Sequence, residues 1–409
     1  MESNLEEKKR FDKVCVLGLG YIGLPTASLL ATKGYDVVGV DISKKVVDTI
    51  NKGEIHIVEP DLDILVKSAV QSGKLRATLN PEKADVFFIC VPTPFKENHV
   101  PDISYVEKAT NSIVDFVKKG NLIILESTSP PKTTEKVAAI LKKSGLNVDK
   151  DLYIVHAPER VLPGNILHEA IYNDRIIGGI NSESAEVCDE FYKTFVKGPI
   201  FLTNAVTAEL AKLCENSYRD VNIAFANELS LIADKLEIDV WELINLANKH
   251  PRVNILNPGP GVGGHCIAVD PWFIVDSAPE QAQLIKLARK INDTKPEIVV
   301  EKVKQVAKKF HKPVIACLGL AYKPDIDDLR ESPAIKIVEK LIGLELGEIL
   351  ACEPNVEEVL IRDIKISSLE EALDQADIVV VLVAHSVFTN IDKNLLKEKI
   401  ILDICGAWE

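Results

Sequence analysis

Short runs of consecutive apolar residues alternate with amphipathic stretches over roughly the first 200 residues of the chain. The segment KVCVLGLGYIGLPTASLLATKGYDVVGVD, residues 13–41, reads as a strand, a glycine turn, a helix and a second strand. Further strands are predicted at ADVFFICVPTP, NLIILEST and LYIVHAPE, with helical spacing between them. Unbroken apolar runs are typical of a parallel sheet that helices cover on both faces. Residues 1–203 are therefore predicted to form a doubly wound, Rossmann-like α/β domain.

The pattern changes to helical spacing alone after residue 204. Residues 206–235 contain no Gly or Pro and repeat apolar residues at helical intervals, which predicts one long helix. Helical spacing returns in DVWELINLAN and in EQAQLIKLARKINDTKPEIVVEKVKQVAKKF, on either side of a loop rich in glycine and proline. Residues 204–312 are therefore predicted to be a helical connector, whose long central helix joins two lobes.

The strand pattern returns after residue 312 and repeats the beginning of the chain. PVIACLGLAYK echoes KVCVLGLGYIG, ADIVVVLVAH echoes ADVFFICVPTP, and KIILDICG echoes NLIILESTS. Residues 313–409 are therefore predicted to form a second, smaller Rossmann-like domain of the nucleotide-binding type.

Composition and charge exclude several classes of protein. The length of 409 residues fits two or three domains, and a net charge of −13 without any Lys/Arg block argues against a nucleic-acid partner. No apolar run resembles a secretory signal or reaches the ~18 residues of a membrane span. None of the eight cysteines forms a C-x-x-C pair, so neither a metal site nor a disulfide framework is expected. These features predict a cytoplasmic protein.

Three glycines follow the first predicted strand in the spacing of a dinucleotide-binding turn. Gly18 permits the tight turn, Gly20 lets the backbone approach a pyrophosphate, and Gly23 lets the helix pack closely on the strand. Asp41 ends the next strand, where a carboxylate accepts a hydrogen bond from a ribose 2′-hydroxyl and repels a 2′-phosphate. Thr93 follows another strand at the edge where such sheets bind ligands. The pattern favours NAD over NADP, against the alternative of a glycine turn without a nucleotide.

The repeated turn in the second α/β region is less specific. It keeps Gly319 but has Ala321 in place of the second glycine, followed by Tyr322 and Lys323. A tyrosine and a lysine at the carboxyl end of a strand suit a phosphate or a sugar. They are equally compatible with an ordinary turn that carries a solvated lysine, and the residues alone leave both interpretations open.

Three polar residues share one face of the long predicted helix. Lys212, Asn216 and Arg219 fall within about 60° of one another around the axis. A solvated polar stripe is the commonest explanation of such spacing. Two features favour a site instead: the helix is apolar over much of its remaining surface, and it leaves the dinucleotide-binding domain where a substrate would lie.

One cysteine stands in an unusual context, the loop PGPGVGGHCIAVDP at residues 258–271. Most free cysteines are small buried hydrophobes. Cys266 differs because Gly263 and Gly264 before it leave room for a ligand at the backbone. A thiolate beside NAD would attack an aldehyde to give a thiohemiacetal, which passes a hydride to NAD and becomes a thioester. Water and a base would then cleave the thioester, and a lysine would stabilise the oxyanion. Two interpretations stay open for Glu159 and Thr128, which follow predicted strands, and for Asp270. Each can be a catalytic residue or an ordinary solvated one.

Six motifs, taken together and in order, resemble the UDP-glucose/GDP-mannose dehydrogenase family from about residue 12 to the C-terminus. They are GLGYIG, ESTSPPKTTE, APERVLPG, AELAKLCENSYRDVN, GPGVGGHCIAVDPWF and GLAYKPDIDDLRESPA. The resemblance implies an enzyme that oxidises the 6-hydroxymethyl group of a UDP-sugar to a carboxylate, with reduction of two NAD and consumption of one water. Products of the family feed surface polysaccharides or glycans.

The resemblance also implies the role of each candidate catalytic residue. Cys266 matches the nucleophile of the second oxidation, and Lys212 matches the lysine that acts as base or oxyanion partner. Asn216 matches its hydrogen-bonding neighbour, and Asp270 a carboxylate that assists proton transfer. Glu159 matches the acid of thioester hydrolysis, and Thr128 a hydroxyl that holds water.

The same resemblance implies the binding residues. Those expected at NAD are Gly18, Gly20, Tyr21, Ile22, Gly23, Asp41, Thr93, Thr128 and Arg330. Those expected at the UDP-sugar are Arg160, Val161, Lys212, Asn216, Arg219, His250, Arg252, Gly263, Tyr322 and Lys323. The C-terminal domain would hold UDP, and a homodimer or higher homo-oligomer would form largely through the long helix, with Arg252 reaching the neighbouring subunit.

The cysteine loop departs from the family's glucose-type pattern, G-G-S-C-x-x-K-D. This chain has His265 and Val269 at the two positions that differ, which favours an N-acetylated sugar. The rival interpretations are the same chemistry on UDP-N-acetylglucosamine or UDP-glucose, and a non-catalytic nucleotide-binding protein. The presence of both Cys266 and Lys212 argues against the second, because binding alone requires neither.

Overall fold

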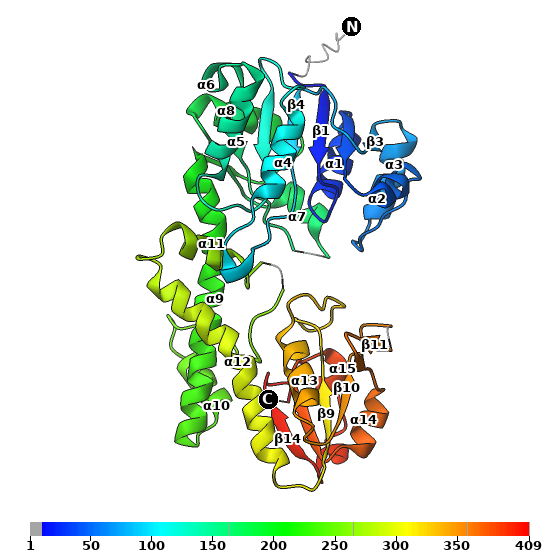
Figure 1. Ribbon diagram of the computed structural model, residues 1–409, viewed down its shortest axis with the longest axis vertical. Coiled ribbons are helices and arrows are strands. Elements are labelled where there is room, and N and C mark those ends of the chain that lie inside the picture. Colours follow the sequence, from blue (N-terminus) through cyan, green and yellow to red (C-terminus); the bar gives the residue numbers. More distant parts are fainter. Residues whose placement is uncertain (1–9, 163, 265, 358, 409) are drawn as a thin grey trace. The chain divides into compact units, whose positions relative to one another are not determined.

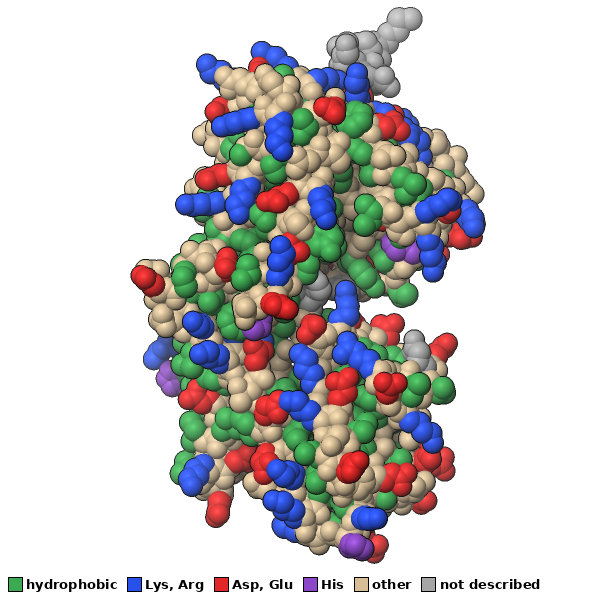
Figure 2. All heavy atoms as spheres, in the orientation of Figure 1, with side chains coloured by type: hydrophobic (Ala, Val, Ile, Leu, Met, Phe, Trp, Pro, Cys, Tyr) green, Lys and Arg blue, Asp and Glu red, His purple; other side chains and the backbone are tan. Residues whose placement is uncertain are grey.

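The computed structural model describes residues 10–408 except 163, 265 and 358, and the chain forms two compact units, Met1–Cys214 and Glu215–Glu409. Within the described ranges, no helix is both long and apolar enough to cross a bilayer. The division into three domains at residues 203 and 312 stays a prediction. The face drawn in Figure 2 intersperses Lys and Arg with Asp and Glu side chains, so neither sign of charge dominates it.

The first unit is built on an eight-stranded sheet with the order β3-β2-β1-β4-β5-β6-β7-β8 (Figure 1). The strands are β1 Lys13–Leu17, β2 Asp36–Val40, β3 Leu75–Thr78, β4 Val86–Ile89, β5 Leu122–Leu125, β6 Tyr153–His156, β7 Arg175–Gly179 and β8 Ile200–Asn204. All four apolar segments that predicted strands in this region are confirmed as β1 with β2, β4, β5 and β6.

One pair of strands differs from the predicted parallel arrangement, because β6 and β7 are antiparallel. Glu159 lies just after β6, and its Oε2 accepts a hydrogen bond of 2.6 Å from an Nη of Arg175, the first residue of β7. The ion pair holds the beginning of β7 at the edge where β6 ends, so β7 runs back along it. The sheet is therefore mixed.

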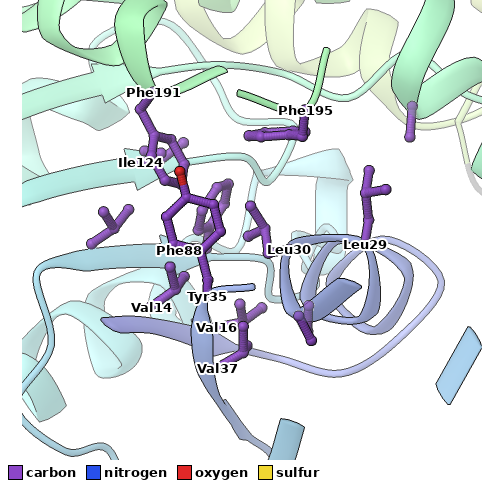
Figure 3. Packing of buried hydrophobic residues seen from close by; sticks show 14 of the residues in the cluster. Val14, Val16, Leu29, Leu30, Tyr35, Val37, Phe88, Ile124, Phe191 and Phe195 are labelled. Carbon is purple, nitrogen blue, oxygen red and sulfur yellow. The ribbon is translucent and has the colours of Figure 1, made fainter. Parts of the chain in front are cut away.

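Helices cover both faces of this sheet, as the unbroken apolar strands predicted. They are α1 Gly23–Thr32, α2 Lys44–Asn51, α3 Leu62–Gln71, α4 Ser104–Ile113, α5 Thr133–Leu141, α6 Val148–Asp151, α7 Ile166–Tyr172 and α8 Ser182–Tyr192, with 3₁₀ turns at Glu97–His99 and Lys142–Ser144. On one face, Phe191 of α8 packs on Tyr35 and Phe88, with ring centroids 5.5 and 6.1 Å apart (Figure 3). The neighbouring strand residues Phe87 and Ile123 belong to a second core on the other face.

The long helix α9, Ala205–Leu236, confirms the segment without glycine or proline and begins in the first unit. Glu209 fixes its first turns to α5. The carboxylate of Glu209 accepts hydrogen bonds from Thr134 N, Thr134 Oγ1 and Lys132 N at 2.7, 2.6 and 2.6 Å. Because the start of α5 has unpaired backbone N–H groups, a carboxylate there is stabilised.

The second unit continues with helices α10 Val240–Ala247, α11 Asp270–Ser277 and α12 Gln283–Ala307, and then a parallel four-stranded sheet with the order β10-β9-β13-β14. Its strands are β9 Val314–Leu318, β10 Glu348–Cys352, β13 Ile378–Val381 and β14 Ile400–Asp403. The other elements are α13 Pro333–Gly343, α14 Leu369–Gln375, α15 Ser386–Thr389, a 3₁₀ turn at Lys393–Leu396 and a hairpin of β11 Leu360–Ile361 with β12 Ile364–Lys365. The repeat seen in the sequence is thus a second α/β layer, with cores on both faces of its sheet.

Candidate active site

The three glycines in the turn of the first unit differ in whether packing alone explains them. Gly18 has φ +91°, and an added Cβ would lie 2.4 Å from the carbonyl oxygen of Cys90. At Gly23 a Cβ would lie 1.8 Å from the carbonyl oxygen of Gly18. Nothing lies within 4 Å of a Cβ at Gly20. Packing alone therefore explains Gly18 and Gly23, whereas Gly20 leaves open space where a pyrophosphate can approach the backbone.

Asp41 follows β2 directly and faces this turn. Its Oδ2 accepts from Leu19 N at 3.1 Å, and its Oδ1 accepts from Ser43 N at 2.9 Å. The side chain is half-buried, so it has acceptor capacity left for a ribose hydroxyl. In the turn itself, Tyr21 is exposed, and Ile22 is the N-cap of α1.

Thr93 and Thr128, which follow β4 and β5, are brought together by the sheet. The hydroxyl of Thr93 donates to the carbonyl oxygen of Thr128 at 2.6 Å. Both lie at the carboxyl edge of neighbouring parallel strands, where doubly wound sheets bind their ligands.

Glu159 lies after β6 in a buried polar cluster. Besides its ion pair with Arg175, its Oε1 accepts from Arg160 N at 2.8 Å. The Arg160 guanidinium in turn donates to the carbonyl oxygen of Asp174, and Val161 packs against the apolar core. Glu159 is 8% exposed, so it lies in an environment that is much drier than an ordinary turn.

Two members of this cluster, Glu126 and Arg175, were missed from the sequence. Glu126 is 3% exposed, and its Oε2 accepts from Cys90 Sγ at 3.0 Å and from Thr26 Oγ1 at 3.4 Å. Burial raises the pKa of Glu126 to about 8, and the negative charge of Glu159 acts in the same direction. The local signal was an acidic residue directly after an apolar strand in NLIILEST. Its partners are far away in sequence.

Lys212 lies on α9, one turn after Glu209, and is half-buried. Burial lowers the pKa of His156, at the end of β6, to about 3, and the positive charge of Lys212 also lowers it. Lys212 is therefore close enough to the carboxyl end of β6 to act on it electrostatically. This placement favours a site over the solvated stripe.

In the second unit, three predicted catalytic residues form one cluster. Asn216 Nδ2 donates to Asp270 Oδ2 at 2.6 Å, and the two side chains are 8% and 5% exposed. The backbone N–H of Asp270 donates to the carbonyl oxygen of Cys266 at 2.9 Å, so the turn that carries Cys266 leads directly into α11. The thiol-bearing residue itself is exposed.

The glycines before Cys266 have a different role from the expected one. A Cβ on Gly263 would lie 2.7 Å from Tyr322 Cβ, and one on Gly264, which has φ +78°, would lie 2.9 Å from the Tyr322 ring. Gly264 N also donates to the carbonyl oxygen of Arg330 at 3.1 Å. The space that the glycines leave is thus filled by Tyr322 and not left open for a ligand. A contact between the Gly263 backbone and a sugar stays a prediction.

Tyr322 is accordingly more than a turn residue. Its ring is half-buried under the cysteine loop, and burial raises the pKa of its hydroxyl, with Asp328 and Cys266 adding to the effect and Arg330 and Arg219 opposing it. These side chains are therefore electrostatic neighbours. Arg330 and Asp328 form an ion pair with a shortest distance of 2.6 Å.

The remaining predicted binding residues are at the surface of the second unit. Arg219 and Lys323 are exposed, as are His250 and Arg252, which follow α10. His265, the residue that distinguishes the loop from the glucose-type pattern, lies outside the described residues. Within the described part of the chain, no group of three or more His, Cys, Asp or Glu side chains could hold a metal ion.

Three family models match the chain in succession. They describe the NAD binding domain, the central domain and the UDP binding domain of the UDP-glucose/GDP-mannose dehydrogenase family, at residues 12–196, 206–294 and 316–409.

Individual relatives are similar over nearly their whole length. The chain is 56% identical to a UDP-N-acetyl-D-mannosamine dehydrogenase of Campylobacter jejuni, over 94% of this chain and 98% of the relative. It is 52% identical to an NDP-N-acetyl-D-galactosaminuronic acid dehydrogenase of Ralstonia nicotianae, over 97% and 96% of the two. Among solved structures, a UDP-D-ManNAc dehydrogenase of Pyrococcus horikoshii is 44% identical, with a TM-score of 0.89 and coverage of 97% and 96%.

Proposed function

Because the chain belongs to the UDP-glucose/GDP-mannose dehydrogenase family, we propose that it oxidises C6 of UDP-N-acetyl-D-mannosamine to the carboxylate with NAD as oxidant. The observation that carries the proposal is the cluster of Cys266, Asp270 and Asn216 beside Tyr322. It puts a thiol, a buried carboxylate and an amide on the same unit as the domain matched by the UDP-binding model. Binding alone would require none of these three side chains.

The first unit is proposed to hold NAD at the turn that begins at Gly18. Open space at Gly20 admits the pyrophosphate, and the positive end of the α1 helix dipole stabilises its charge. Asp41 accepts a hydrogen bond from the ribose 2′-hydroxyl. NAD bound at this turn would supply the hydride acceptor, and side chains of this protein would carry the nucleophile, the proton transfers and the oxyanion contact.

The chemistry begins with loss of a hydride from C6 and of a proton from its hydroxyl, giving an aldehyde. The Cys266 thiolate then adds to the aldehyde carbon, and a second hydride leaves to give a thioester. Water cleaves the C–S bond, which returns the thiol and leaves the carboxylate. Lys212 stabilises the oxyanion formed at C6, and Asn216 lies one turn further along α9.

Proton transfers are assigned to the buried carboxylates. Asp270, hydrogen-bonded to Asn216, exchanges protons with the thiol and the sugar oxygen. Glu159 takes a proton from the attacking water, and the Thr128 hydroxyl orients that water. The ion pair with Arg175 keeps Glu159 in a fixed orientation for this step.

The UDP moiety is assigned to the second unit. Tyr322 and Lys323 are at the carboxyl end of β9, which is the edge where α/β sheets bind ligands. Arg160, Val161, Arg219, His250, Arg252 and Gly263 are the further proposed contacts.

A homodimer through α9 is part of the proposal. Tyr218, Phe225, Ile232 and Leu236 are all exposed in the single chain and recur at intervals of seven, seven and four residues along α9. Such spacing puts them on one face, and an exposed apolar face of this kind marks an interface. Phe225→Glu should therefore lower the mass measured by sedimentation to that of a monomer, and an unchanged mass would contradict the assignment.

The sugar is tested by incubating the enzyme and NAD with a panel of UDP-sugars and identifying products by mass spectrometry. UDP-N-acetyl-D-mannosamine should give the highest kcat/KM and a uronate product. The Ralstonia relative is named as an NDP-N-acetyl-D-galactosaminuronic acid dehydrogenase, so UDP-N-acetyl-D-galactosamine is the strongest rival substrate. A higher kcat/KM with that sugar would replace the assignment. No oxidation of any sugar would favour a nucleotide-binding protein.

A further inference from the structure

The loop that carries Tyr322 is long and needs support from outside itself. It runs from Gly319, after β9, to Ser332, the N-cap of α13, whereas the matching link in the first unit runs only from Gly18 to Ile22. Ordering so many residues costs conformational entropy that neighbouring contacts must offset. Two buried side chains that the proposed mechanism does not use, Glu353 and His385, supply such contacts.

Glu353 holds the beginning of the loop. It follows β10 directly, is 3% exposed, and its Oε2 accepts from Leu320 N at 2.7 Å and from Ala321 N at 2.8 Å. Burial by itself would raise the pKa of this carboxyl, but hydrogen bonds from His385 and from the two backbone N–H groups lower it. The carboxylate thus fixes the two residues immediately before Tyr322.

His385 holds the loop beyond Lys323. The ring is completely buried, and its Nδ1 accepts from the backbone N–H of Asp325 at 2.9 Å. Since a backbone N–H can only donate, the proton of the neutral imidazole is on Nε2, which lies 3.1 Å from Glu353 Oε2. The charged groups around the ring are Glu353 and Asp325, and the amide of Asn355 also contacts Nδ1 at 2.9 Å.

The residue that His385 holds is strained. Asp325 has φ +58°, a conformation that residues other than glycine adopt rarely. Its Oδ1 accepts from Ser386 N at 2.8 Å and from Ser386 Oγ at 3.0 Å. Strain of this kind persists only where the surroundings over-determine it, and it is frequent at ligand-binding loops.

We propose that Glu353 and His385 are positioning residues for the nucleotide sugar. Together they fix residues 320–325 at both ends, so that Tyr322 supports the cysteine loop and Lys323 meets the UDP phosphates. The proposal rests on the proposed function in taking UDP as the ligand of this loop. It predicts that loss of the pair weakens UDP binding without weakening NAD binding. The NAD turn belongs to the other unit, and Arg330, the residue of this loop that is expected at NAD, lies beyond residues 320–325 and is oriented by its own ion pair with Asp328.

The test is a calorimetric titration of the full-length protein with UDP, and separately with NAD, for four variants. His385→Ala removes the hydrogen bonds that the ring makes with Asp325 N and Glu353, and its contact with Asn355. His385→Asn keeps an acceptor near the position of Nδ1, and His385→Gln keeps a donor near Nε2, so each retains one bond and guards against failure of the alanine variant to fold. Thr389→Val is the control, since it removes a hydrogen bond to Ser386 O within α15 without touching the loop.

His385→Ala should raise the Kd for UDP by about tenfold or more, with smaller increases for His385→Asn and His385→Gln. Thr389→Val should match the wild type, and NAD affinity should be the same in all four. In turnover, KM for the UDP-sugar should rise while KM for NAD stays constant. Equal UDP affinity in wild type and His385→Ala, or a parallel loss of NAD affinity, would overturn this inference alone. A wild-type protein that binds no UDP would overturn the proposed function and this inference with it.

Discussion

The two α/β regions begin with the same turn and use it in opposite ways. Gly18 and Gly319 have φ +91° and +93°, and their N–H groups donate to the last residue of the neighbouring strand at 2.8 and 2.9 Å. The next N–H in each turn donates to the acidic residue after that strand, Asp41 in one unit and Glu353 in the other. The backbone geometry is therefore shared, and the difference between the regions lies in the side chains and in the link that follows.

That difference decides which ligand each region suits. Asp41 is half-buried and keeps acceptor capacity, and the space at Gly20 is open. Glu353 is fully engaged by backbone and His385, and Ala321, at the position of the second glycine, is completely buried. The first turn can receive a dinucleotide. In the second turn, the carboxylate of Glu353 holds the loop of Tyr322 through hydrogen bonds. A repeated sequence pattern thus reports a repeated fold and not a repeated function.

The largest expected effect is the loss of uronate formation when Cys266 is replaced, with NAD binding unchanged. Cys266→Ser should lower uronate formation by at least about a thousandfold while the Kd for NAD is unchanged, because the thiol belongs to the second unit and acts on the sugar. Product formation is followed by mass spectrometry and NAD binding by calorimetry. Cys214→Ser, another exposed cysteine, is the control. Full turnover by Cys266→Ser would refute the thioester route.

The next largest effect tests the assignment of Asp41 to the ribose of NAD. Asp41→Ala should raise KM for NAD by about ten- to a hundredfold, because a hydrogen bond to a charged group contributes roughly 1.5–3 kcal/mol. KM for the UDP-sugar should stay the same. Asp36→Ala, at the exposed opposite end of β2, is the matched control. Equal changes in both KM values would count against the assignment of Asp41 to the ribose.

A smaller effect separates packing from ligand binding within the glycine turn. Gly18→Ala should destabilise the fold by about 2 kcal/mol or more, because the new Cβ meets a carbonyl oxygen at an unfavourable φ. Gly20→Ala should change stability by no more than about 0.5 kcal/mol, since the space is open, yet weaken NAD binding. Thermal unfolding and NAD titration check the pair. Unchanged NAD affinity in Gly20→Ala would show that the open space is not a phosphate site.

The last prediction concerns Glu126, a buried acid whose pKa is raised. The pKa of Glu126 rises to about 8 in the folded protein, so the folded state binds the proton more tightly than the unfolded one. Its contribution to stability is present below the ordinary pKa of glutamate, near 4.5, and is lost as pH rises towards 8. Glu126→Gln should remove this decline. The free energy of unfolding of both proteins is measured with urea between pH 4.5 and 8. A difference between wild type and Glu126→Gln that stays constant over this range would contradict the raised pKa.

The sequence predicted what local patterns encode. Apolar strands and the helix α9 are each specified within a few turns of chain, and each is confirmed. Asp41 lies at the glycine turn, as the sequence indicated, and its role at NAD stays a prediction. What depends on residues far apart was missed or wrong. The antiparallel β7 begins at Arg175, whose ion pair is with Glu159 in the segment after β6, and Glu126 has a partner 100 residues away in α1. The role of Gly264 could not be read either, since Tyr322 comes from another element.

The central claim is that one active site performs two oxidations of one sugar. The most direct test is to count the NADH released per UDP-N-acetyl-D-mannosamine consumed, with the sugar limiting and NAD in excess. The account predicts two NADH for each sugar and complete conversion to the uronate. One NADH for each sugar with an aldehyde product, or none, would contradict it.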